Sequence, residues 1–360
     1  MKKRITRYHK HTTMNHFKVP TPFGTVSNKI AAFDLDGTLI TTQSKRRFPK
    51  DKDDWRLLNE KVALKLQYLV KEGYTIVVFT NQKNLEKRMS KADFKGKCCN
   101  IQEAIGVPML FYVSLEDGYM RKPFPGMFEV HKNQHPVMLE ESFYVGDAWS
   151  KKHCFSNSDL CFAQNCQITF YKARDFFAVA ADDCALAEPY VEVTPSPFVD
   201  RDPQFVATQL QLRQFLTDKD YVFIVSPPAS GKTTFCERYL PEFVRLSKDD
   251  HKGAAYRKII KENADNKIVF DNTNSTFRAR EKLLSYLPKK KVGYIVRQVS
   301  KEQALFLNKY RCFVTKGAGE LLPDVAIYSH YKRLQIPTGD EVFHIDSAWI
   351  TANQMATFFC

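Results

Sequence analysis

Apolar residues in the first half of the chain come in short runs, separated by longer stretches with helical spacing. Runs at 29–33, 75–79, 143–145 and 167–170 predict buried strands, and the stripe at 62–70 predicts a helix. Strands that alternate with helices are typical of a parallel sheet with helices on both faces.

The same alternation returns in the second half. Runs at 221–225, 267–270 and 292–296 predict strands, and the periodic stretches at 279–286 and 301–310 predict helices. The fold class expected for the chain is therefore α/β, with two domains that each contain a parallel sheet.

A proline-rich stretch divides the two halves. Residues 188–203 (EPYVEVTPSPFVDRDP) hold four prolines and show no helical period, so we expect a linker at 186–204. The domains expected on either side are 28–185 and 205–360, and residues 1–27 are expected to form a flexible basic arm.

The chain carries an excess of positive charge. Among its 360 residues, 54 are Lys or Arg and 40 are Asp or Glu, which gives a net charge of +14. This surplus favours polyanionic partners, nucleic acid before a membrane surface, although a basic protein that needs only solubility has the same composition. No run approaches 18 apolar residues, so no membrane span is expected.

The N-terminal segment is the most basic part of the sequence. Residues 1–33 contain seven Lys or Arg and no acidic residue. A nuclear import signal, a mitochondrial presequence and a nucleic-acid-binding tail all fit this composition, whereas a secretory signal does not, because the segment has no apolar middle. The nine cysteines form no CxxC pair, so reduced thiols are expected instead of a zinc site or a disulfide framework.

Two aspartates follow the first predicted strand in the sequence FDLDGTLI. Asp34 is expected at the carboxyl end of that strand, with Asp36 two residues further on. Carboxylates this close need a cation to offset their repulsion, and Mg²⁺ with oxygen ligands suits them. The chemistry expected is attack of Asp34 on phosphorus to form an aspartyl-phosphate, with Asp36 as general acid and then general base.

Further polar residues follow later strands in the order that this chemistry needs. Thr80 and Asn81 end the strand TIVVF and are placed to hold phosphate oxygens, and Lys122 in YMRKPFPGM is placed to neutralise the phosphate. Asp147 ends FYVGD and is expected to bind the metal, with support from Asp159.

The second half holds a sequence similar to a phosphate-binding loop, SPPASGKT at 226–233, directly after the strand YVFIV. Gly231 permits close approach of the backbone, Lys232 is placed to reach the phosphates of ATP, and Thr233 is placed to bind Mg²⁺. Ser226 stands where the standard motif has its first glycine, so the conformation of the loop is the open question.

Candidates for a phosphoryl-transfer reaction come next in the sequence. Asp249 in SKDD is the expected acceptor of a proton from an attacking hydroxyl, and Asp250 is its rival for that role. Asp271 ends the strand before NTN, where a site is expected, and Lys309 and Arg311 are basic residues for a lid over the phosphates.

These motifs together resemble a known family over most of the chain. The first half resembles the 3′-phosphatase domain of polynucleotide kinase 3′-phosphatases, a branch of the haloacid-dehalogenase-type phosphatases, in TTQSKRRFPKDKDDW, EGYTIVVFTNQ, YMRKPFPGM, YVGDA and SDLCFAQN. The second half resembles the P-loop kinase domain of that family in ASGKTTF, SKDD, VFDNTN, NKYR and PDVAIYSHYKRLQIP. The resemblance implies two Rossmann-like parallel-sheet domains, phosphatase before kinase.

The resemblance also implies roles for residues in both halves. In the phosphatase half the implied residues are catalytic Asp34, Asp36 and Lys122, phosphate-binding Thr80, Asn81, Ser44, Lys45 and Arg121, and metal-binding Asp34, Asp36, Asp147 and Asp159. Thr42 is also implied to lie near the entering 3′-phosphate end. In the kinase half they are the base Asp249, ATP-binding Ser230, Gly231, Lys232, Thr233, Thr234, Lys309 and Arg311, metal-binding Thr233, and the supporting Lys248, Asp271 and Asn274.

One loop departs from the family pattern. After FTNQ the family has a loop with glycine and arginine, and here the residues are KNLEKR at 83–88. Lys87 or Arg88 is expected to replace the family's basic contact.

We therefore expect a bifunctional enzyme that uses ATP and Mg²⁺, removes 3′-phosphates and phosphorylates 5′-hydroxyl ends, so that a ligase can seal strand breaks. DNA is favoured over RNA as the partner, and ligase or other repair proteins are further expected partners. The family's N-terminal phosphopeptide-binding module is not expected, and neither is a membrane. We expect a monomer in the nucleus, with the mitochondrion and cytoplasm as alternatives.

Two other functions stay open at this point. One is a small-molecule phosphatase fused to a nucleoside or metabolite kinase, which keeps the folds and changes the substrate. The other is a strand-end-binding protein whose kinase has decayed, which Ser226 suggests and the retained Lys232 and Thr233 oppose.

Overall fold

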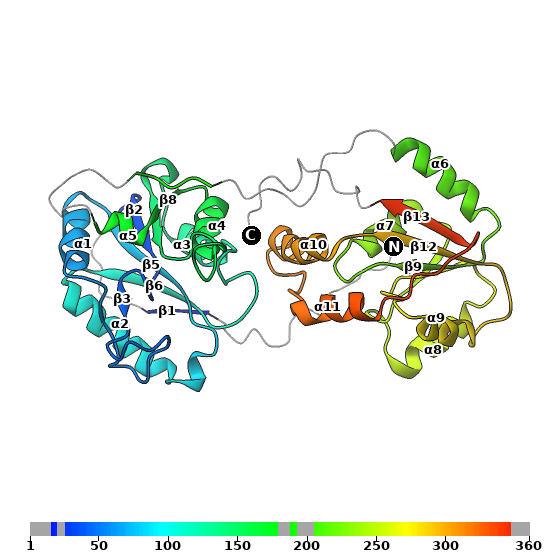
Figure 1. Ribbon diagram of the computed structural model, residues 1–360, viewed down its shortest axis with the longest axis horizontal. Helices are drawn as coiled ribbons and strands as arrows, with labels where there is room; N and C mark the ends of the chain where they lie inside the picture. Colours follow the sequence, from blue (N-terminus) through cyan, green and yellow to red (C-terminus); the bar gives the residue numbers. More distant parts are fainter. Residues whose placement is uncertain (1–15, 20–25, 179–187, 193–204, 347–360) are drawn as a thin grey trace. The chain divides into compact units, whose positions relative to one another are not determined.

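The computed structural model describes residues 16–19, 26–178, 188–192 and 205–346. They fall into two compact units that divide within the proline-rich stretch, and each unit is described by itself (Figure 1). The expected basic arm and most of the expected linker lie outside the described residues. Within these ranges no helix is long and apolar enough to cross a membrane.

The first unit is built on a six-stranded sheet with the strand order β1-β6-β5-β2-β7-β8. All neighbours are parallel except β1, an edge strand that runs antiparallel to β6. The strands are β1 (His16–Val19), β2 (Ile30–Phe33), β5 (Thr75–Asn81), β6 (Met109–Ser114), β7 (Phe143–Gly146) and β8 (Thr169–Lys172). The sequence reasoning did not identify β6 and placed β8 two residues early.

Helices cover both faces of this sheet, because successive strand residues point to opposite sides. Ala31 and Phe33 of β2 pack into the core beneath α1, α2 and α5, whereas Ile30 and Ala32 pack into the core beneath α3 and α4. The helices are α1 (Lys61–Lys71), α2 (Lys91–Ile105), α3 (Gly126–Gln134), α4 (Ser158–Cys166) and α5 (Ala173–Phe176), with short 3₁₀ turns at Leu85–Lys87 and Leu139–Glu141.

An insertion leaves the first unit's sheet directly after β2. It contains a small antiparallel pair, β3 (Ile40–Thr41) and β4 (Arg56–Leu57), with residues 42–55 between them. This insertion and the loops after β5 and β7 all leave from the carboxyl edge of the sheet, where a site is expected.

Part of the expected linker belongs to the first unit. The Tyr190 N–H donates to the Phe170 carbonyl at 2.9 Å, and the Tyr190 ring lies 5.2 Å from the Trp149 ring. Residues 188–192 are therefore packed against the first unit.

The second unit is built on a five-stranded sheet, with the order β10-β11-β9-β12-β13 and every neighbour parallel. Its strands are β9 (Tyr221–Val225), β10 (Val244–Leu246), β11 (Ile268–Phe270), β12 (Val292–Gln298) and β13 (Val342–Asp346). Buried residues of β9 alternate between the two faces: Val222 and Ile224 pack with α6 and α7, and Tyr221 and Phe223 with α8 and α9. The α/β class with parallel sheets is confirmed.

The helices of the second unit connect its strands and frame the phosphate loop. They are α6 (Phe205–Leu216), α7 (Lys232–Tyr239), α8 (Gly253–Glu262), α9 (Phe277–Leu284), α10 (Lys301–Val314) and α11 (Asp324–Arg333). Ser300 begins α10 with a capping box, in which its hydroxyl accepts from the Gln303 N–H and the Gln303 side chain accepts from the Ser300 N–H.

Candidate active sites

Three carboxylates meet at the carboxyl edge of the first sheet. Asp34 follows β2, Asp147 follows β7, and Asp159 lies in the first turn of α4. One ligand oxygen of each lies within 4.8 Å of those of the other two. Strands β2 and β7 are neighbours in a register that pairs Phe33 with Val145, so the residues that follow them emerge side by side.

Lys122 sits among these acids and is buried. Its Nζ donates to Asp34 Oδ1 at 2.6 Å, to Asp159 Oδ1 at 2.8 Å and to the Tyr144 hydroxyl at 2.7 Å. The backbone of Lys122 is held by Asn81, which donates to the Lys122 carbonyl at 3.1 Å and accepts from its N–H at 3.0 Å. The lysine is therefore fixed at both its main chain and its ammonium group.

The charges in this cluster depend on one another. Burial raises the pKa of Asp34 well above its usual range, although the Lys122 charge opposes the shift. Burial and then the charge of Asp159 raise the pKa of Asp147 to about 6. Burial also acts against the Lys122 ammonium, but Asp159 and Asp34 outweigh it and raise the pKa of Lys122. A further cation at this point would favour the ionised carboxylates.

The arrangement fits Mg²⁺, which prefers oxygen ligands. The backbone must come very close to the acids to form it. A Cβ at Gly37, where φ is +82°, would lie 2.3 Å from Asp147 Oδ2, and a Cβ at Gly146 would lie 2.5 Å from the Asp159 carboxylate. Only glycine leaves room for these side chains.

The Asp36 side chain is not one of the three carboxylates of this group, and its expected role as a metal ligand stays a prediction. Its Oδ2 accepts from Gln82 Nε2 at 2.6 Å, and Gln82 also donates to the Thr80 hydroxyl at 3.0 Å. The carboxylate of Asp36 is thus turned toward the loop after β5, and it remains a candidate for acid–base chemistry.

The other residues expected near a 3′-phosphate have different surroundings. Ser44 donates to Asp54 through its hydroxyl at 2.6 Å and its N–H at 2.7 Å, so it shapes the insertion between β3 and β4. Lys45 is exposed. Arg121 Nη1 is buried without a hydrogen-bond partner among the described residues, while its Nε lies 3.5 Å from Asp117. These three phosphate-binding roles stay predictions.

The phosphate-loop sequence forms a tight turn between β9 and α7. The Ser230 hydroxyl donates to the Pro227 carbonyl at 2.8 Å and lies 2.7 Å from the Ser226 hydroxyl, which is therefore the donor of that pair. Left-handed conformations occur at Ala229 (φ 59°) and Gly231 (φ 78°). Ser226 is not among the left-handed residues, so the missing first glycine is no obstacle to this turn.

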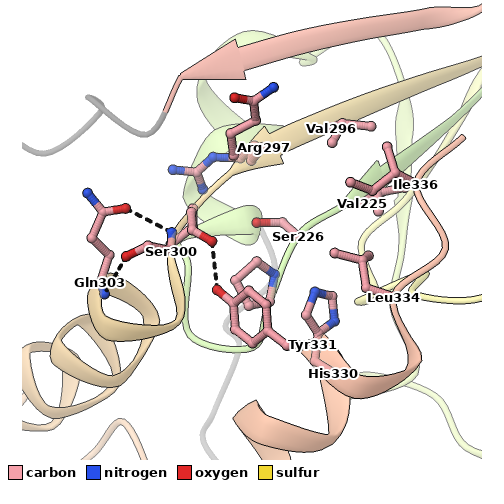
Figure 2. A pocket seen from close by; sticks show the side chains of 13 residues that line it. Val225, Ser226, Val296, Arg297, Ser300, Gln303, His330, Tyr331, Leu334 and Ile336 are labelled. Carbon is pink, nitrogen blue, oxygen red and sulfur yellow. Dashed lines mark hydrogen bonds between the residues drawn. The ribbon is translucent and has the colours of Figure 1, made fainter. Parts of the chain in front are cut away.

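Two cations lie at the phosphate loop, the buried Arg297 and the half-buried Lys232. Arg297 of β12 donates from Nη1 to the Ser230 carbonyl and lines, with Ser226, a cavity of about 410 Å³ (Figure 2). Burial lowers the pKa of Arg297 to about 10, so it is charged at neutral pH. Lys232 donates to the Pro227 carbonyl at 2.7 Å, and burial lowers the pKa of Lys232 to about 8.

Thr233, the second residue of α7, is hydrogen-bonded to Asp271, which directly follows β11. Its hydroxyl donates to Asp271 Oδ2 at 2.7 Å, and the same oxygen accepts from Arg245 Nη1 at 2.7 Å. Asn274 donates to the carbonyls of Ile224 and Phe270 at 3.0 and 2.9 Å, which ties the loop after β11 to β9. The Thr233 hydroxyl beside a carboxylate fits a Mg²⁺ site at the mouth of the phosphate loop.

A second cavity, of about 700 Å³, opens over the phosphate loop. It brings together the expected Lys232, Thr233, Thr234, Lys248, Asp249, Asp271, Asn274 and Arg311. Lys309, the other expected lid residue, is not among those that line it. Asp249 reaches this cavity, whereas Asp250 pairs with Arg245 at 2.5 Å outside it.

Sequence reasoning missed the supporting residues Tyr144, Gln82, Arg245 and Arg297. Each lies in or directly after a strand, at a position whose neighbours across the sheet are distant in the sequence. The single available signal was a charged or polar residue next to a short apolar run, as with Arg245 and Arg297.

Comparisons with known proteins match both halves. A model of the family described as polynucleotide kinase 3 phosphatase matches residues 29–177. The chain is 29% identical over 330 residues to the bifunctional polynucleotide phosphatase/kinase of Schizosaccharomyces pombe, which covers 88% of this chain and 78% of that protein.

Two further relatives each match less than half of the chain. The chain is 44% identical over 167 residues to an uncharacterized 20.8 kDa protein of Autographa californica nuclear polyhedrosis virus, covering 44% of this chain and 91% of that protein. It is 33% identical over 170 residues to the polynucleotide 3′-phosphatase ZDP of Arabidopsis thaliana, covering 42% of this chain and 24% of that protein.

Proposed function

This chain belongs to the bifunctional polynucleotide phosphatase/kinase family, and from that premise we propose that it repairs both ends of a broken strand. The first site removes a 3′-phosphate, and the second transfers the γ-phosphate of ATP to a 5′-hydroxyl. The resulting 3′-hydroxyl and 5′-phosphate are the ends that a ligase joins.

In the phosphatase reaction Asp34 Oδ attacks the phosphorus of the 3′-phosphate and the bond to the 3′-oxygen breaks. Asp36 gives a proton to that oxygen and then takes one from the water that releases phosphate from Asp34. The Lys122 ammonium, 2.6 Å from Asp34, favours the ionised nucleophile despite its burial. Mg²⁺ held by Asp34, Asp147 and Asp159 would offset the charge of the phosphate. Arg121 Nη1 is a buried donor available to a phosphate oxygen.

In the kinase reaction Lys232 and the N-terminus of α7 hold the phosphates of ATP, and Thr233 with Asp271 would hold Mg²⁺, which would offset the charge of those phosphates. Asp249 takes the proton from the 5′-hydroxyl as its oxygen bonds to the γ-phosphorus, and ADP leaves. Arg311 lines the same cavity and is placed to neutralise the transferred phosphoryl group.

One observation favours a polynucleotide substrate over a small molecule. Arginine and phenylalanine side chains alternate in a row beside the first site, and we call this row the ladder. The Arg88 guanidinium lies 5.0 Å from the Phe48 ring, and the Arg47 guanidinium lies 5.5 Å from Phe48 and 4.5 Å from Phe155. Phe48 is 57% exposed and Phe155 is 88% exposed. Among the described residues neither guanidinium has an ion-pair partner.

The residues of the ladder come from three segments that follow β5, β2 and β7. Arg88 comes from the loop after β5, Arg47 and Phe48 from the insertion after β2, and Phe155 from the loop after β7. Because β2 lies between β5 and β7, all three segments follow the same edge of the sheet that bears Asp34. Exposed rings next to unpaired cations suit stacked bases and a phosphate backbone.

A basic groove beside the kinase site supports the same substrate class. A cavity of about 680 Å³ between α8 and α9 shares Lys248 with the catalytic cavity and is also lined by Lys252, Arg257, Lys282, Tyr256 and Tyr286. Within the described part of the chain these four cations form no ion pair and no carboxylate lines the groove. It suits the phosphates that follow a 5′-hydroxyl nucleotide.

The test uses an oligonucleotide with a 5′-hydroxyl and a 3′-phosphate, incubated with Mg²⁺ and ATP and resolved by mass. Gain of the 5′-phosphate, abolished by Lys232→Ala alone, together with loss of the 3′-phosphate, abolished by Asp34→Asn alone, supports the proposal. Loss of the 3′-phosphate alone supports a decayed kinase, and preference for mononucleotides supports the small-molecule alternative.

We further propose that the enzyme acts on DNA in strand-break repair, in the nucleus. The net charge of +14 suits a polyanionic substrate. Matched DNA and RNA oligonucleotides compared by kcat/KM test the first part, and the position of a fluorescent fusion in cells tests the second. Equal rates on RNA, or a fusion excluded from nuclei, would contradict it.

A further inference from the structure

Arg245 of β10 lies between two acids of the kinase half. Its Nη1 donates to Asp271 Oδ2 at 2.7 Å, and its Nη2 donates to Asp250 Oδ2 at 2.5 Å. The Asp271 side chain is 3% exposed and that of Asp250 is 48% exposed. One guanidinium thus joins a buried carboxylate to one at the surface.

The buried end of this network reaches the expected metal site. Asp271 Oδ2 accepts from the Thr233 hydroxyl as well as from Arg245. Three elements are connected in this way: β10 through Arg245, the end of β11 through Asp271, and the first turn of α7 through Thr233. The position of the Asp271 carboxylate is fixed from two sides.

The exposed end of the network concerns which of two aspartates accepts the proton of the 5′-hydroxyl. Asp249 and Asp250 are adjacent, and either one is a candidate to take the proton of the 5′-hydroxyl. Asp249 lines the catalytic cavity, whereas Asp250 does not and has its carboxylate held by Arg245. The charge-assisted bond to Arg245 fixes the direction of the Asp250 carboxylate, and Asp249 is the member of the pair that faces the cavity.

We propose that Arg245 is a positioning residue of the kinase site. It holds Asp250 away from the acceptor, so that Asp249 alone takes the hydroxyl proton, and it holds Asp271 against Thr233. The inference rests on the proposed kinase function and assigns a residue that the reaction needs but does not touch.

Arginine has the geometry for both tasks. Its planar group presents two nitrogens that reach two acceptors at once, whereas a lysine ammonium in the same place keeps the charge without the fork. Despite its burial, the hydrogen bond that Arg245 donates to Asp271 and the charge of Asp250 raise the pKa of Arg245, so the group remains charged. Lysine at this position is therefore expected to hold one acid and release the other.

The test compares Arg245→Met and Arg245→Lys with Arg238→Met, a matched exposed arginine on α7 that lines neither the catalytic cavity nor the groove. We expect Arg245→Met to lower kcat by about 10–100-fold, the usual effect of losing a residue that orients a metal ligand. Affinity for Mg·ATP, measured directly by titration calorimetry, should fall, while KM for the oligonucleotide should change little. Arg245→Lys should recover part of kcat, and Arg238→Met should resemble the wild type.

A second comparison keeps the inference testable if Arg245→Met does not fold. Asp249→Asn should abolish transfer, and Asp250→Asn should retain most of it. Equal losses in these two variants, or a folded Arg245→Met with wild-type kcat and Mg·ATP affinity, would overturn the positioning role. Absence of 5′-phosphorylation by the wild type on any acceptor would instead refute the proposed kinase function itself.

Discussion

The ammonium of Lys122 donates a hydrogen bond to the Asp34 carboxylate at 2.6 Å, across 88 positions of the sequence. Asp159 binds the same ammonium from another side at 2.8 Å, and all three side chains are largely buried. Attraction among these charges offsets the cost of burying them. The Lys122 charge also favours the ionised form of the Asp34 carboxylate.

Lys122→Met should abolish the phosphatase activity and destabilise the first unit. The substitution leaves two buried carboxylates without their cation, and breaking a buried pair of this kind costs about 3–5 kcal/mol. The 3′-phosphatase rate measures the loss of activity, and the midpoint temperature at which the first unit unfolds measures the loss of stability. The kinase rate of the same protein is the internal control, and an unchanged phosphatase rate would contradict the role of Lys122.

Phe155→Ala should weaken binding of a 3′-phosphate oligonucleotide while it leaves kcat nearly unchanged. Stacking of a base on an aromatic ring contributes about 1–3 kcal/mol, and 1.4 kcal/mol is about a tenfold change in KM. Leu64→Ala on α1 is the matched control, because Leu64 is also exposed but lies away from the ladder. If both variants bind alike, Phe155 does not stack on the substrate.

Lys282→Ala should raise KM for a 5′-hydroxyl oligonucleotide and flatten its dependence on salt. A lysine that neutralises one backbone phosphate contributes about one unit to the slope of log affinity against log salt. Lys261→Ala on α8 serves as the control, since Lys261 is exposed and does not line the groove. Identical salt slopes in the two variants would place the acceptor strand elsewhere.

Ala229→Gly should stabilise the second unit by about 1 kcal/mol. Ala229 has φ 59°, and a left-handed conformation costs a residue with a Cβ about 1–2 kcal/mol, part of which glycine regains at the expense of unfolded-state entropy. Ala255→Gly in the exposed part of α8 should have the opposite sign, at about 0.5–1 kcal/mol. Chemical denaturation of the two variants decides whether the strain exists.

The part of the insertion between β3 and β4 should lose local stability in acid. Hydrogen bonds from Ser44 and Lys50 lower the pKa of Asp54 to about 2, below its ordinary 3.8. A lowered pKa means that the stabilisation is complete above about pH 4 and disappears as the pH falls toward 2. The protection factors of the Ser44 and Lys50 amides in hydrogen exchange, which correct for the pH dependence of intrinsic exchange, measure this stabilisation. Asp54→Asn should give low protection at every pH. High protection in that variant, unchanged with pH, would contradict this prediction.

Much of the fold was predictable because its signals are local. The runs at 75–79 and 221–225 are long, β-branched and apolar, and both form central strands. Strand β6 was missed although Met109–Ser114 is an apolar, buried run with Gly106 and Pro108 before it and Gly118 after it, so its local signal was present in the sequence. The expected position of β8 was two residues early because Gln167 takes a left-handed conformation, which a residue other than glycine does not indicate in a sequence.

The sequence by itself determined the two α/β halves and the order of the polar motifs, since each follows a short apolar run that has to become a strand. The tertiary structure decided which side chains meet. Register between β10 and β11 brings Arg245 to Asp271, and the loop after β6, held by Asn81 of β5, brings Lys122 to Asp34. Asp36 bonds to Gln82 and is not among the three grouped carboxylates. The physical reason is that neighbours in a parallel sheet are separated by whole crossover helices, so contacts between them leave no trace in local spacing.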